Sequence, residues 1–448
     1  MSSDSARFGD LFLEPQRNGL TRPKKVRGAG LPMVNMGELF AYPRIRDIPM
    51  DLVPVDRKEH HYLLETGDLL FARQSLVLSG AGQCSIFLGS SAATVFESHL
   101  IRCRLDARRS NAHFYFYFFR SPEGRRAIEA IVEQGAGASG IRGSDLVNVQ
   151  VPNPPKRIQD EIAEILGSID DRITLLRETN ATLEAIAQAL FKSWFVDFDP
   201  VRAKMEGRTP EGMDEATAAL FPDGFETSEL GEVPRGWRSA AMEDVSIVGI
   251  GKTPPRKEQH WFSEDSNDVR WVSIRDMGIC GTYASTTNEF LTAEAVDKFN
   301  VRRVPDNTVL MSFKMTIGRV AITDGEMTTN EAIAHFRLDP ASQLSTEFIY
   351  LHLRQFDFSR LSSTSSIADA VNSKTVRQIP ILVPSREVAT AFQEKIGVVF
   401  EMLKSNEQQA QTLATLRDTL LPRLISGQLR LPEAQAATEA AIGDAPQA

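Results

Sequence analysis

The chain has 448 residues, of which 42% are hydrophobic and 24% charged. These proportions are ordinary for globular proteins, so they exclude a wholly disordered chain, a collagen and a coiled-coil fibre, and the length suits two to four domains. The net charge is −9 but uneven: residues 1–155 contain 19 basic and 16 acidic side chains, and residues 156–235 contain 9 and 17. This acidity argues against loose binding along any DNA duplex, although it is compatible with two small basic faces.

Neither a membrane protein nor a secreted one is indicated. No apolar run approaches the ~18 residues that a membrane span needs, and residues 1–10 lack the apolar core of a signal peptide. The cysteines Cys84, Cys103 and Cys280 lie far apart in the sequence, which fits neither a disulfide framework nor a cysteine-rich zinc site. We expect a cytoplasmic protein that does not enter a membrane.

The chain reads as two diverged copies of one module, offset by roughly 230–240 residues. Residues 69–71 correspond to 309–311, and residues 84–86 to 320–322. Further segments correspond in the same order: 33–36 with 271–274, 104–106 with 337–339, 114–117 with 348–351, and 145–152 with 375–382. Each match is weak, and chance agreement of strand-like patterns is the alternative. The common order favours a duplication, and the offset is too long for a solenoid repeat.

Each copy contains the same succession of expected elements. Short strands separated by Gly and Pro come first: 69–71, 83–88 and 100–105 in the first copy, and 309–312, 319–323 and 334–338 in the second. An aromatic helix follows at 112–119 and at 347–354, then a strand that ends at a proline cluster, then a long helix. The predicted fold class is therefore a mixed α/β (α+β) two-fold repeat.

The long helix after each copy has a sustained heptad pattern. Apolar residues recur at alternating steps of four and three from Ile162 to Trp194, and again from Phe392 to Leu424, which is typical of a coiled-coil seam. Each helix would be roughly 50–60 Å long at 1.5 Å per residue, and such a helix alone cannot bury its seam. We expect an antiparallel pair of long coiled-coil helices that separates the two modules.

Each seam contains one asparagine near its middle, Asn180 and Asn406. A polar seam residue lowers stability but fixes register and orientation, so we expect the two asparagines to lie close together as a register device. The alternative is that one or both point to water from the edge of the seam. Pro422 cannot sit unkinked in a helix interior, so the second helix is expected to bend or stop near Leu421.

No catalytic, nucleotide-binding or metal-binding motif is readable. Gly251-Lys252-Thr253 ends like a phosphate-binding loop, but Ser246 stands where the first glycine of that motif is needed, and two prolines follow where a helix should open. Residues 153–156, Asn-Pro-Pro-Lys, lack the aromatic residue of an adenine-methyltransferase motif, so they read as a stop before a helix. The pair His60-His61 has no plausible further ligands and reads as a surface pair.

Three segments resemble one protein family. Residues 183–201, LEAIAQALFKSWFVDFDPV, look like the central conserved region of the specificity subunit of type I restriction–modification enzymes. Residues 230–237, LGEVPRGW, resemble that family's entry into a target-recognition domain, and residues 420–427, LLPRLISG, resemble the end of its distal conserved region. The family's order of recognition domain, conserved helix, recognition domain and conserved helix covers nearly the whole chain.

The resemblance implies a non-catalytic subunit that directs an adenine-methyltransferase and restriction complex. Each recognition domain would read one half of a bipartite double-stranded DNA target, and the helices would set the spacer. Two methyltransferase subunits that use S-adenosylmethionine, and ATP- and Mg-dependent restriction subunits, would join the complex, with no cofactor in this chain. The implied domains are recognition domains at 1–155 and 236–384, a central conserved region at 156–235, a distal conserved region at 385–432 and a disordered tail at 433–448. A coiled-coil scaffold that joins two protein-binding modules without DNA is the alternative.

DNA reading requires Arg or Lys at phosphates, and Arg, Lys, Asn or Gln at base edges. The DNA-binding candidates are Lys24, Lys25, Arg27, Arg44, Arg46, Arg73 and Gln74 in the first module, and Lys252, Arg256, Lys257, Arg275, Lys314 and Arg319 in the second. For each residue alone the alternative is a solvated surface charge.

Apolar side chains crowd the ends of the two long helices, which suggests a contact patch for partner subunits. The partner-docking candidates are Leu190, Phe191, Trp194, Phe195 and Phe198 on the first helix, and Leu420, Leu424 and Ile425 on the second. The alternative is that these side chains close the protein's own core. Which bases are read depends on loop geometry and DNA shape, and neither is readable from the sequence.

Overall fold

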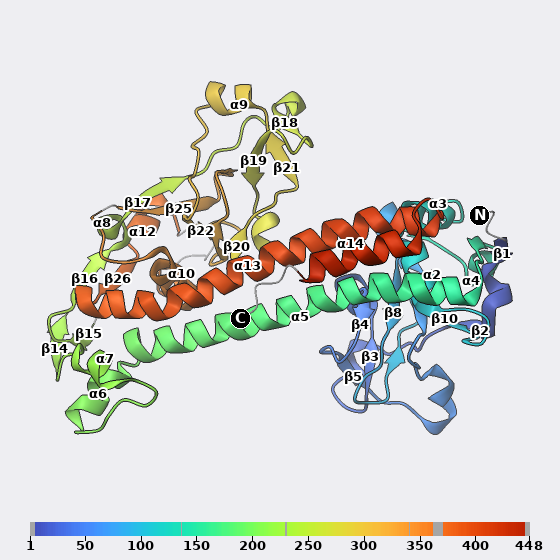
Figure 1. Ribbon diagram of the computed structural model, residues 1–448, viewed down its shortest axis with the longest axis horizontal. Helices are drawn as coiled ribbons and strands as arrows, with labels where there is room; N and C mark the ends of the chain where they lie inside the picture. The colour runs from blue at the N-terminus through green and yellow to red at the C-terminus, as the bar shows by residue number, and fades with distance from the viewer. Residues whose placement is uncertain (1–4, 136, 229–230, 340, 362–370, 444–448) are drawn as a thin grey trace. The chain divides into compact units, whose positions relative to one another are not determined.

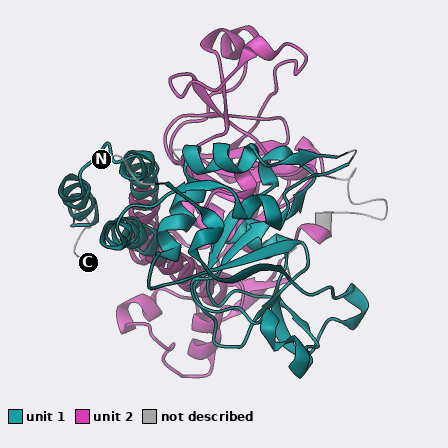
Figure 2. Cartoon of the chain, turned by 90° about the vertical axis from the view of Figure 1, so that its right-hand side faces the viewer, with its two compact units in different colours: residues 1–174, 410–448 teal, residues 175–409 magenta. Residues whose placement is uncertain are grey.

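The computed structural model describes residues 5–135, 137–228, 231–339, 341–361 and 371–443. It divides into two compact units, shown in different colours in Figure 2. Unit 1 comprises residues 1–174 and 410–448, and unit 2 comprises residues 175–409. Two helices of 40 residues each, α5 (Lys156–Phe195) and α13 (Arg386–Ile425), contribute to both units (Figure 1).

Unit 1 is built on a five-stranded sheet in the order β2-β10-β6-β8-β4. All its neighbouring strands are antiparallel except β4 and β8, which are parallel. A second sheet has the order β5-β3-β9, a third the order β11-β12-β7, and β1 pairs with β13. The strands are β1 (Ser5–Arg7), β2 (Phe12–Asn18), β3 (Leu31–Val34), β4 (Arg44–Ile45), β5 (Asp51–Val53), β6 (Leu69–Ala72), β7 (Gln74–Ser75), β8 (Cys84–Phe87), β9 (Val95–Phe96), β10 (Leu100–Leu105), β11 (Glu133–Gln134), β12 (Ser139–Gly140) and β13 (Gln150–Pro152).

Unit 2 is built on a five-stranded sheet in the order β17-β25-β22-β23-β20. Here too all neighbours are antiparallel except the last pair, β20 and β23. A second sheet has the order β18-β21-β19-β24, and β16 pairs with β26 and β14 with β15. The strands are β14 (Phe225–Ser228), β15 (Gly231–Pro234), β16 (Arg238–Ala241), β17 (Ser246–Ile250), β18 (Phe262–Ser263), β19 (Val269–Val272), β20 (Tyr283–Ala284), β21 (Glu289–Leu291), β22 (Val309–Ser312), β23 (Val320–Thr323), β24 (Thr328–Thr329), β25 (Ile333–Leu338) and β26 (Pro380–Val383).

The two units repeat one topology, which confirms the duplication. The five-stranded sheets have the same strand order and the same directions, with β6 in the place of β22 and β8 in the place of β23. In both units the second sheet contains an antiparallel pair followed by a parallel one, β5-β3-β9 and β21-β19-β24. The pairs that the sequence aligned, such as residues 69–71 with 309–311, fall on corresponding strands.

Each main sheet is packed against an aromatic helix, α2 (Ala112–Arg120) in unit 1 and α10 (Thr346–Gln355) in unit 2. Both helices begin at a capping side chain: Asn111 accepts hydrogen bonds from two backbone N–H groups, and Ser345 accepts one. In unit 1 the ring of Phe119 packs edge-on against Phe71 of β6, with ring centroids 5.0 Å apart.

The remaining helices are short, except for one at the C-terminal side. They are α1 (Met36–Ala41), α3 (Pro122–Glu129) and α4 (Gly143–Val147) in unit 1, α6 (Asp199–Met205), α7 (Glu215–Ala219), α8 (Met242–Val245), α9 (Ala293–Lys298) and α12 (Ser373–Arg377) in unit 2, and α14 (Leu431–Gly443) in unit 1. Helix α13 continues past Pro422 and ends one turn later, at Ile425. The helix therefore does not stop at Leu421, and the alternative of a bend at Pro422 stays a prediction.

Helix α14 corrects the expectation of a disordered tail at 433–448. Residues up to Gly443 are helical, and residues 444–448 lie outside the described part of the chain. Ala434 and Thr438 are buried, and α14 forms a groove with Ile165 and Ser168 of α5. The tail is rich in alanine, a strong helix former, and its buried side chains are too small to give an obvious apolar pattern.

Candidate nucleic-acid interface

Two short 3-10 helices of unit 1, η2 (Lys24–Val26) and η3 (Arg57–Tyr62), form a basic surface. Arg22 holds them together: its Nη2 donates to Glu59 Oε2 at 2.5 Å, and its Nε donates to the Pro54 carbonyl at 2.9 Å. The Arg22 guanidinium also lowers the pKa of Glu59. Lys24 and Lys25 are exposed beside this anchor. The segment that contains Lys24 and Lys25 therefore has a defined structure, from which both lysines point into solvent.

Helix η3 adds two cations that were not among the DNA-binding candidates. Arg57 and Lys58 are exposed on it, and His60 of the predicted surface pair is exposed beside them. Residues 57–61 contain Arg, Lys and two His around Glu59, and this density of basic side chains is the signal in the sequence that could have identified the surface. The flanking Asp56 and Glu59 concealed it, because the segment is nearly neutral when charges are only summed.

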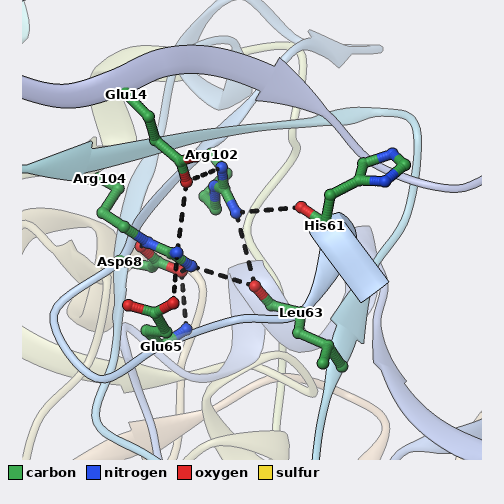
Figure 3. Close-up of polar contacts among 7 residues, drawn as sticks. All are labelled: Glu14, His61, Leu63, Glu65, Asp68, Arg102 and Arg104. Atoms are coloured by element: carbon green, nitrogen blue, oxygen red, sulfur yellow. Dashed lines mark hydrogen bonds and ion pairs between the residues drawn. The ribbon is translucent and has the colours of Figure 1, made fainter. Parts of the chain in front are cut away.

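A polar network ties the end of η3 to the main sheet (Figure 3). Arg102 of β10 is 1% exposed, and its Nη2 lies 2.5 Å from Glu14 Oε1. Its Nη1 lies 3.4 Å from the carbonyl oxygens of His61 and Leu63. Desolvation lowers the pKa of Arg102. The buried guanidinium therefore fixes the chain just after the exposed cations of η3.

Arg104, two residues along the same strand, extends this network. Its Nε and Nη2 each donate to one oxygen of the buried Asp68 at 2.8 Å, a bidentate arrangement. Its Nη1 lies 2.5 Å from Glu65 Oε1. Asp68 directly precedes β6, so Arg104 links two strands of the main sheet to the segment that carries η3.

Two predicted contact residues of unit 1 are engaged within the protein. Arg27 Nη1 lies 2.6 Å from Asp51 Oδ2. Arg44 Nη2 lies 2.6 Å from Asp171 Oδ1 of α5, and only 16% of the Arg44 side chain is exposed. Both arginines therefore form ion pairs within the protein that stabilise its local structure. The other candidates, Arg46, Arg73 and Gln74, are exposed.

In unit 2 the predicted cations fall into two groups. Arg256 is clamped: its guanidinium makes two hydrogen bonds to Glu289, at 2.8 and 2.9 Å, and lies 4.2 Å from the Phe262 ring centroid and 4.6 Å from that of Trp271. Arg319 is half-buried and donates to the Ile274 carbonyl at 2.7 Å. The remaining candidates are exposed: Lys252, Lys257, Arg275 and Lys314.

The aromatic side chains predicted to dock partner subunits are instead core residues of unit 2. Phe191, Trp194 and Phe195 are 2%, 3% and 6% exposed. Phe195 packs edge-on against Phe348 of α10 and against Phe392 of α13, with centroids 4.8 Å apart in each case. The heptad pattern marks these residues as apolar but does not say that a recognition module covers them, so the sequence left both alternatives open.

The other docking candidates are also largely covered. Leu190 and Phe198 are half-buried against the same core of unit 2. Leu420, Leu424 and Ile425 are buried in unit 1. A docking surface on these helices therefore has to use side chains other than these apolar ones.

Asn180 and Asn406, both in unit 2, lie together as the heptad phase predicts. Asn406 Nδ2 donates to Asn180 Oδ1 at 2.8 Å, and Asn180 Nδ2 donates to the Leu403 carbonyl at 3.0 Å. In unit 1, Arg417 Nη1 lies 2.7 Å from Asp170 Oδ1. In each unit α5 therefore contacts α13.

The described residues contain no group of three or more His, Cys, Asp or Glu side chains that could hold a metal ion. None of their helices combines the length and the hydropathy that crossing a bilayer requires.

Comparisons with known proteins point in one direction. The family model described as "Type I restriction modification DNA specificity domain" matches residues 56–185 and 234–416. The HindI type I restriction enzyme specificity subunit of Haemophilus influenzae is 31% identical over 362 residues, which cover 70% of this chain and 77% of that protein. The MjaIX specificity subunit of Methanocaldococcus jannaschii is 24% identical over 336 residues, covering 72% and 70%. A solved type I restriction–modification S subunit from M. genitalium has a similar fold, with a TM-score of 0.51 at 15% identity, covering 95% and 96%.

Proposed function

Because the chain belongs to the family of type I restriction–modification specificity subunits, we propose that it binds double-stranded DNA and reads a bipartite target for such a complex. The main support is that one topology occurs twice, once in each unit, and that each copy displays its own exposed cations. Two copies of one reader suit a target that is split into two half-sites. The recognition domains would be residues 1–155 and 236–384, each reading one half.

Exposed cations at the loops of each recognition domain would contact DNA. Lysine and arginine at phosphates supply affinity, whereas amide and guanidinium groups at base edges supply specificity. The exposed candidates in the first domain are Lys24, Lys25, Arg46, Arg57, Lys58, Arg73 and Gln74, and in the second Lys252, Lys257, Arg275 and Lys314. Arg27, Arg44, Arg256 and Arg319 would act mainly by holding these loops in place.

The long helices, in residues 156–235 and 385–432, would form an antiparallel coiled coil that sets the distance between half-sites. Their seam residues support this proposal, because Ile169, Ile173, Ile396 and Leu403 are almost fully buried. A helix of 40 residues is about 60 Å long. A stiff spacer of fixed length turns half-site separation into a geometric requirement.

Catalysis would reside in the partners of this chain. Two methyltransferase subunits would dock on the helical regions and supply S-adenosylmethionine for adenine methylation, and restriction subunits would supply ATP- and Mg-dependent cleavage. The complex would act on DNA in the cytoplasm. This chain would contribute the sequence specificity of the complex, which is a DNA-binding role without a cofactor of its own.

Methylome sequencing tests the proposal. The chain is co-expressed in a methylation-free host with a methyltransferase subunit from the same genome, and modified adenines are mapped. The expected result is one bipartite motif whose two halves are separated by a fixed number of unspecified bases. Methylation that does not depend on this chain, or a continuous motif, would contradict it. Lys252→Ala/Lys257→Ala should then weaken occupancy through the half-site of unit 2, whereas Lys298→Ala in the same unit serves as the control.

A further inference from the structure

The most exposed large apolar side chains of the described residues are Leu76, at 89%, and Met315, at 93%. They occupy corresponding positions in the two units. Leu76 lies between β6 and β8, and Met315 lies between β22 and β23, which are the equivalent strands of the repeated sheet. Single exposed apolar residues are common on protein surfaces. Here, however, the equivalent loops of both units each expose an apolar side chain at the tip, and this coincidence requires an explanation.

The loop of unit 1 is held in shape by its neighbours. Strand β7, just before Leu76, pairs with β12. The Val77 N–H donates to Ser75 Oγ at 3.2 Å, and Arg125 Nη2 donates to the Ser79 carbonyl at 3.1 Å. A side chain at Gly80 would collide with Ser75, because its Cβ would lie 2.2 Å from Ser75 Oγ. These contacts hold the loop in a conformation that leaves the Leu76 side chain in solvent.

The loop of unit 2 is pinned at its base. The Ser312 hydroxyl donates to the Thr316 carbonyl and accepts from the Arg319 N–H at 3.0 Å, and the Gly318 N–H donates to the Ser312 carbonyl at 2.9 Å. Met315 at the tip has φ of +61°, a left-handed conformation that a non-glycine residue rarely adopts. Backbone strain in a tight, pinned loop is a recurrent feature of functional sites.

A second exposed apolar residue comes from corresponding segments of the two units, each of which borders the loop that carries the tip. In unit 1 it is Phe40 of α1, whose ring atom would lie 3.5 Å from a Cβ at Gly80 of the tip loop. In unit 2 it is Ile279, which is 72% exposed. The neighbouring Gly278 borders Arg319, since a Cβ there would lie 2.5 Å from Arg319 Nη1.

Cations flank both apolar tips. Arg73 and Gln74 lie three and two residues before Leu76, and Lys314 directly precedes Met315. Among the residues that the structure describes, Arg73, Arg275 and Lys314 make no ion pair, and all three are exposed. An apolar tip framed by uncompensated positive charge is complementary to a ligand that combines anionic groups with apolar faces. Nucleic acid has that chemistry: phosphates outside, and base faces and thymine methyl groups inside.

We infer that Leu76 and Met315 are the apolar tips that each recognition domain inserts among the bases of its DNA half-site, while the flanking cations contact phosphates. This inference rests on the proposed DNA-binding function. The contact is apolar, either with a thymine methyl group in the major groove or with a base face where a step is opened. Such a contact involves no charged group. Losing it should therefore lower the affinity and the sequence selectivity of DNA binding without changing the salt dependence of Kd.

The test uses the full chain in complex with its methyltransferase subunits and the duplex found by methylome mapping. Leu76→Ala and Met315→Ala are each expected to weaken binding of that duplex about fivefold or more at every salt concentration, because an apolar base contact is lost while phosphate contacts stay. The methylome should show relaxed selectivity in one half-site for Leu76→Ala and in the other for Met315→Ala. Leu13→Ala and Met205→Ala, which remove side chains of the same type that are 57% and 56% exposed elsewhere, are the matched controls and should bind like the parent.

Duplexes with uracil in place of single thymines, and duplexes with 2-aminopurine at single steps, identify the contact. If replacing a thymine by uracil weakens binding of the parent but not of Leu76→Ala or Met315→Ala, the tip contacts the thymine methyl group in the groove. If 2-aminopurine fluorescence rises with the parent but not with these variants, the tip contacts a base face at an opened step. Unchanged affinity and unchanged half-site selectivity in both variants would overturn the inference, as would normal DNA binding combined with loss of methyltransferase assembly. Failure of the parent complex to bind any duplex would instead overturn the proposed function.

Discussion

The side-chain amide of Asn406 donates a 2.8 Å hydrogen bond to Asn180 Oδ1, so the two polar residues of the helical seams contact each other directly. The other amide, Asn180 Nδ2, donates to the Leu403 carbonyl. A register slip by one turn would separate the pair and place an unpaired amide against apolar side chains, which costs free energy. The bond therefore supports the register role expected for these residues, and that role stays a prediction.

Replacing both asparagines should separate stability from register. Asn180→Leu/Asn406→Leu is expected to raise Tm by several degrees, because apolar seam residues stabilise a coiled coil more than a polar pair does. Each single substitution should do worse than the double, since it leaves one amide without its partner. Calorimetry of the four proteins gives the coupling energy, expected to be about 1 kcal/mol. Additive effects of the two single changes would exclude a specific pair.

The buried guanidinium of Arg102 should matter far more than an exposed one. Arg102→Met leaves the His61 carbonyl without this donor, and it leaves Glu14 and the Leu63 carbonyl with Arg104 alone, so we expect a loss of roughly 3 kcal/mol of stability. Arg108→Ala removes a pair whose arginine is 83% exposed, and it should have little effect on stability because water screens the pair. Denaturant unfolding of both variants makes the comparison. Equal losses would show that the network of Figure 3 does not stabilise the fold.

The repeat could be predicted from sequence because it depends on order, which survives divergence. Hydrophobic runs such as residues 69–71 and 309–311 mark the central strands β6 and β22, since strands covered on both faces need continuous apolar residues. The strands β4 and β20, which run parallel to β8 and β23 at the edges of the two sheets, could not be predicted. They have two residues each, which is too short for a periodic pattern.

The site was harder to predict than the fold because charge alone does not tell exposure. Arg44 and Arg46 look equivalent in the sequence, yet Arg44 pairs with Asp171 of a helix that begins more than a hundred residues later, and Arg46 is exposed. The partner of a buried ion can lie anywhere in the chain. Exposed apolar tips such as Leu76 are equally invisible, because a leucine is normally expected inside.

Lys24→Ala/Lys25→Ala should weaken DNA binding through phosphate contacts. The variant is expected to bind its specific duplex several-fold less tightly and to lower the slope of log Kd against log salt by up to about two units. Arg27 is left in place, because its bond to Asp51 would confound binding with folding. Arg108→Ala/Arg109→Ala, an exposed basic pair outside the candidate surface, is the control. An unchanged salt slope removes Lys24 and Lys25 from the interface.

Helix α14 should contribute to the stability of unit 1. Ala434→Asp introduces a charge at a fully buried position, and we expect it to lower Tm by several degrees, equivalent to roughly 2 kcal/mol or more. Ala436→Asp makes the same change at an exposed position two residues away and should be nearly neutral. Differential scanning fluorimetry compares the two. Equal melting temperatures for both variants would indicate that α14 does not pack on α5 in solution.

The stability of unit 2 should depend on pH through Glu407 of α13. Burial raises the pKa of this carboxyl group to about 7, and the like charges of Glu184 and Asp324 act in the same direction. Hydrogen bonds from the N–H groups of Thr282 and Tyr283, at 2.8 and 3.0 Å, oppose the rise without cancelling it. The folded protein therefore binds a proton more tightly than the unfolded chain does.

Linkage then fixes the sign of the effect. Between the ordinary pKa of a glutamic acid, about 4.3, and the folded value of about 7, the folded state holds more protons, so stability falls as pH rises through this window. Glu407→Gln cannot ionise and should lack this fall, although it loses one N–H acceptor at every pH. The difference in stability between variant and parent should therefore shift by about 2–3 kcal/mol in favour of the variant from pH 4.5 to 7.5. Glu401→Gln, on an exposed position of the same helix, is the control, and parallel pH profiles for Glu407→Gln and the parent would rule out this role.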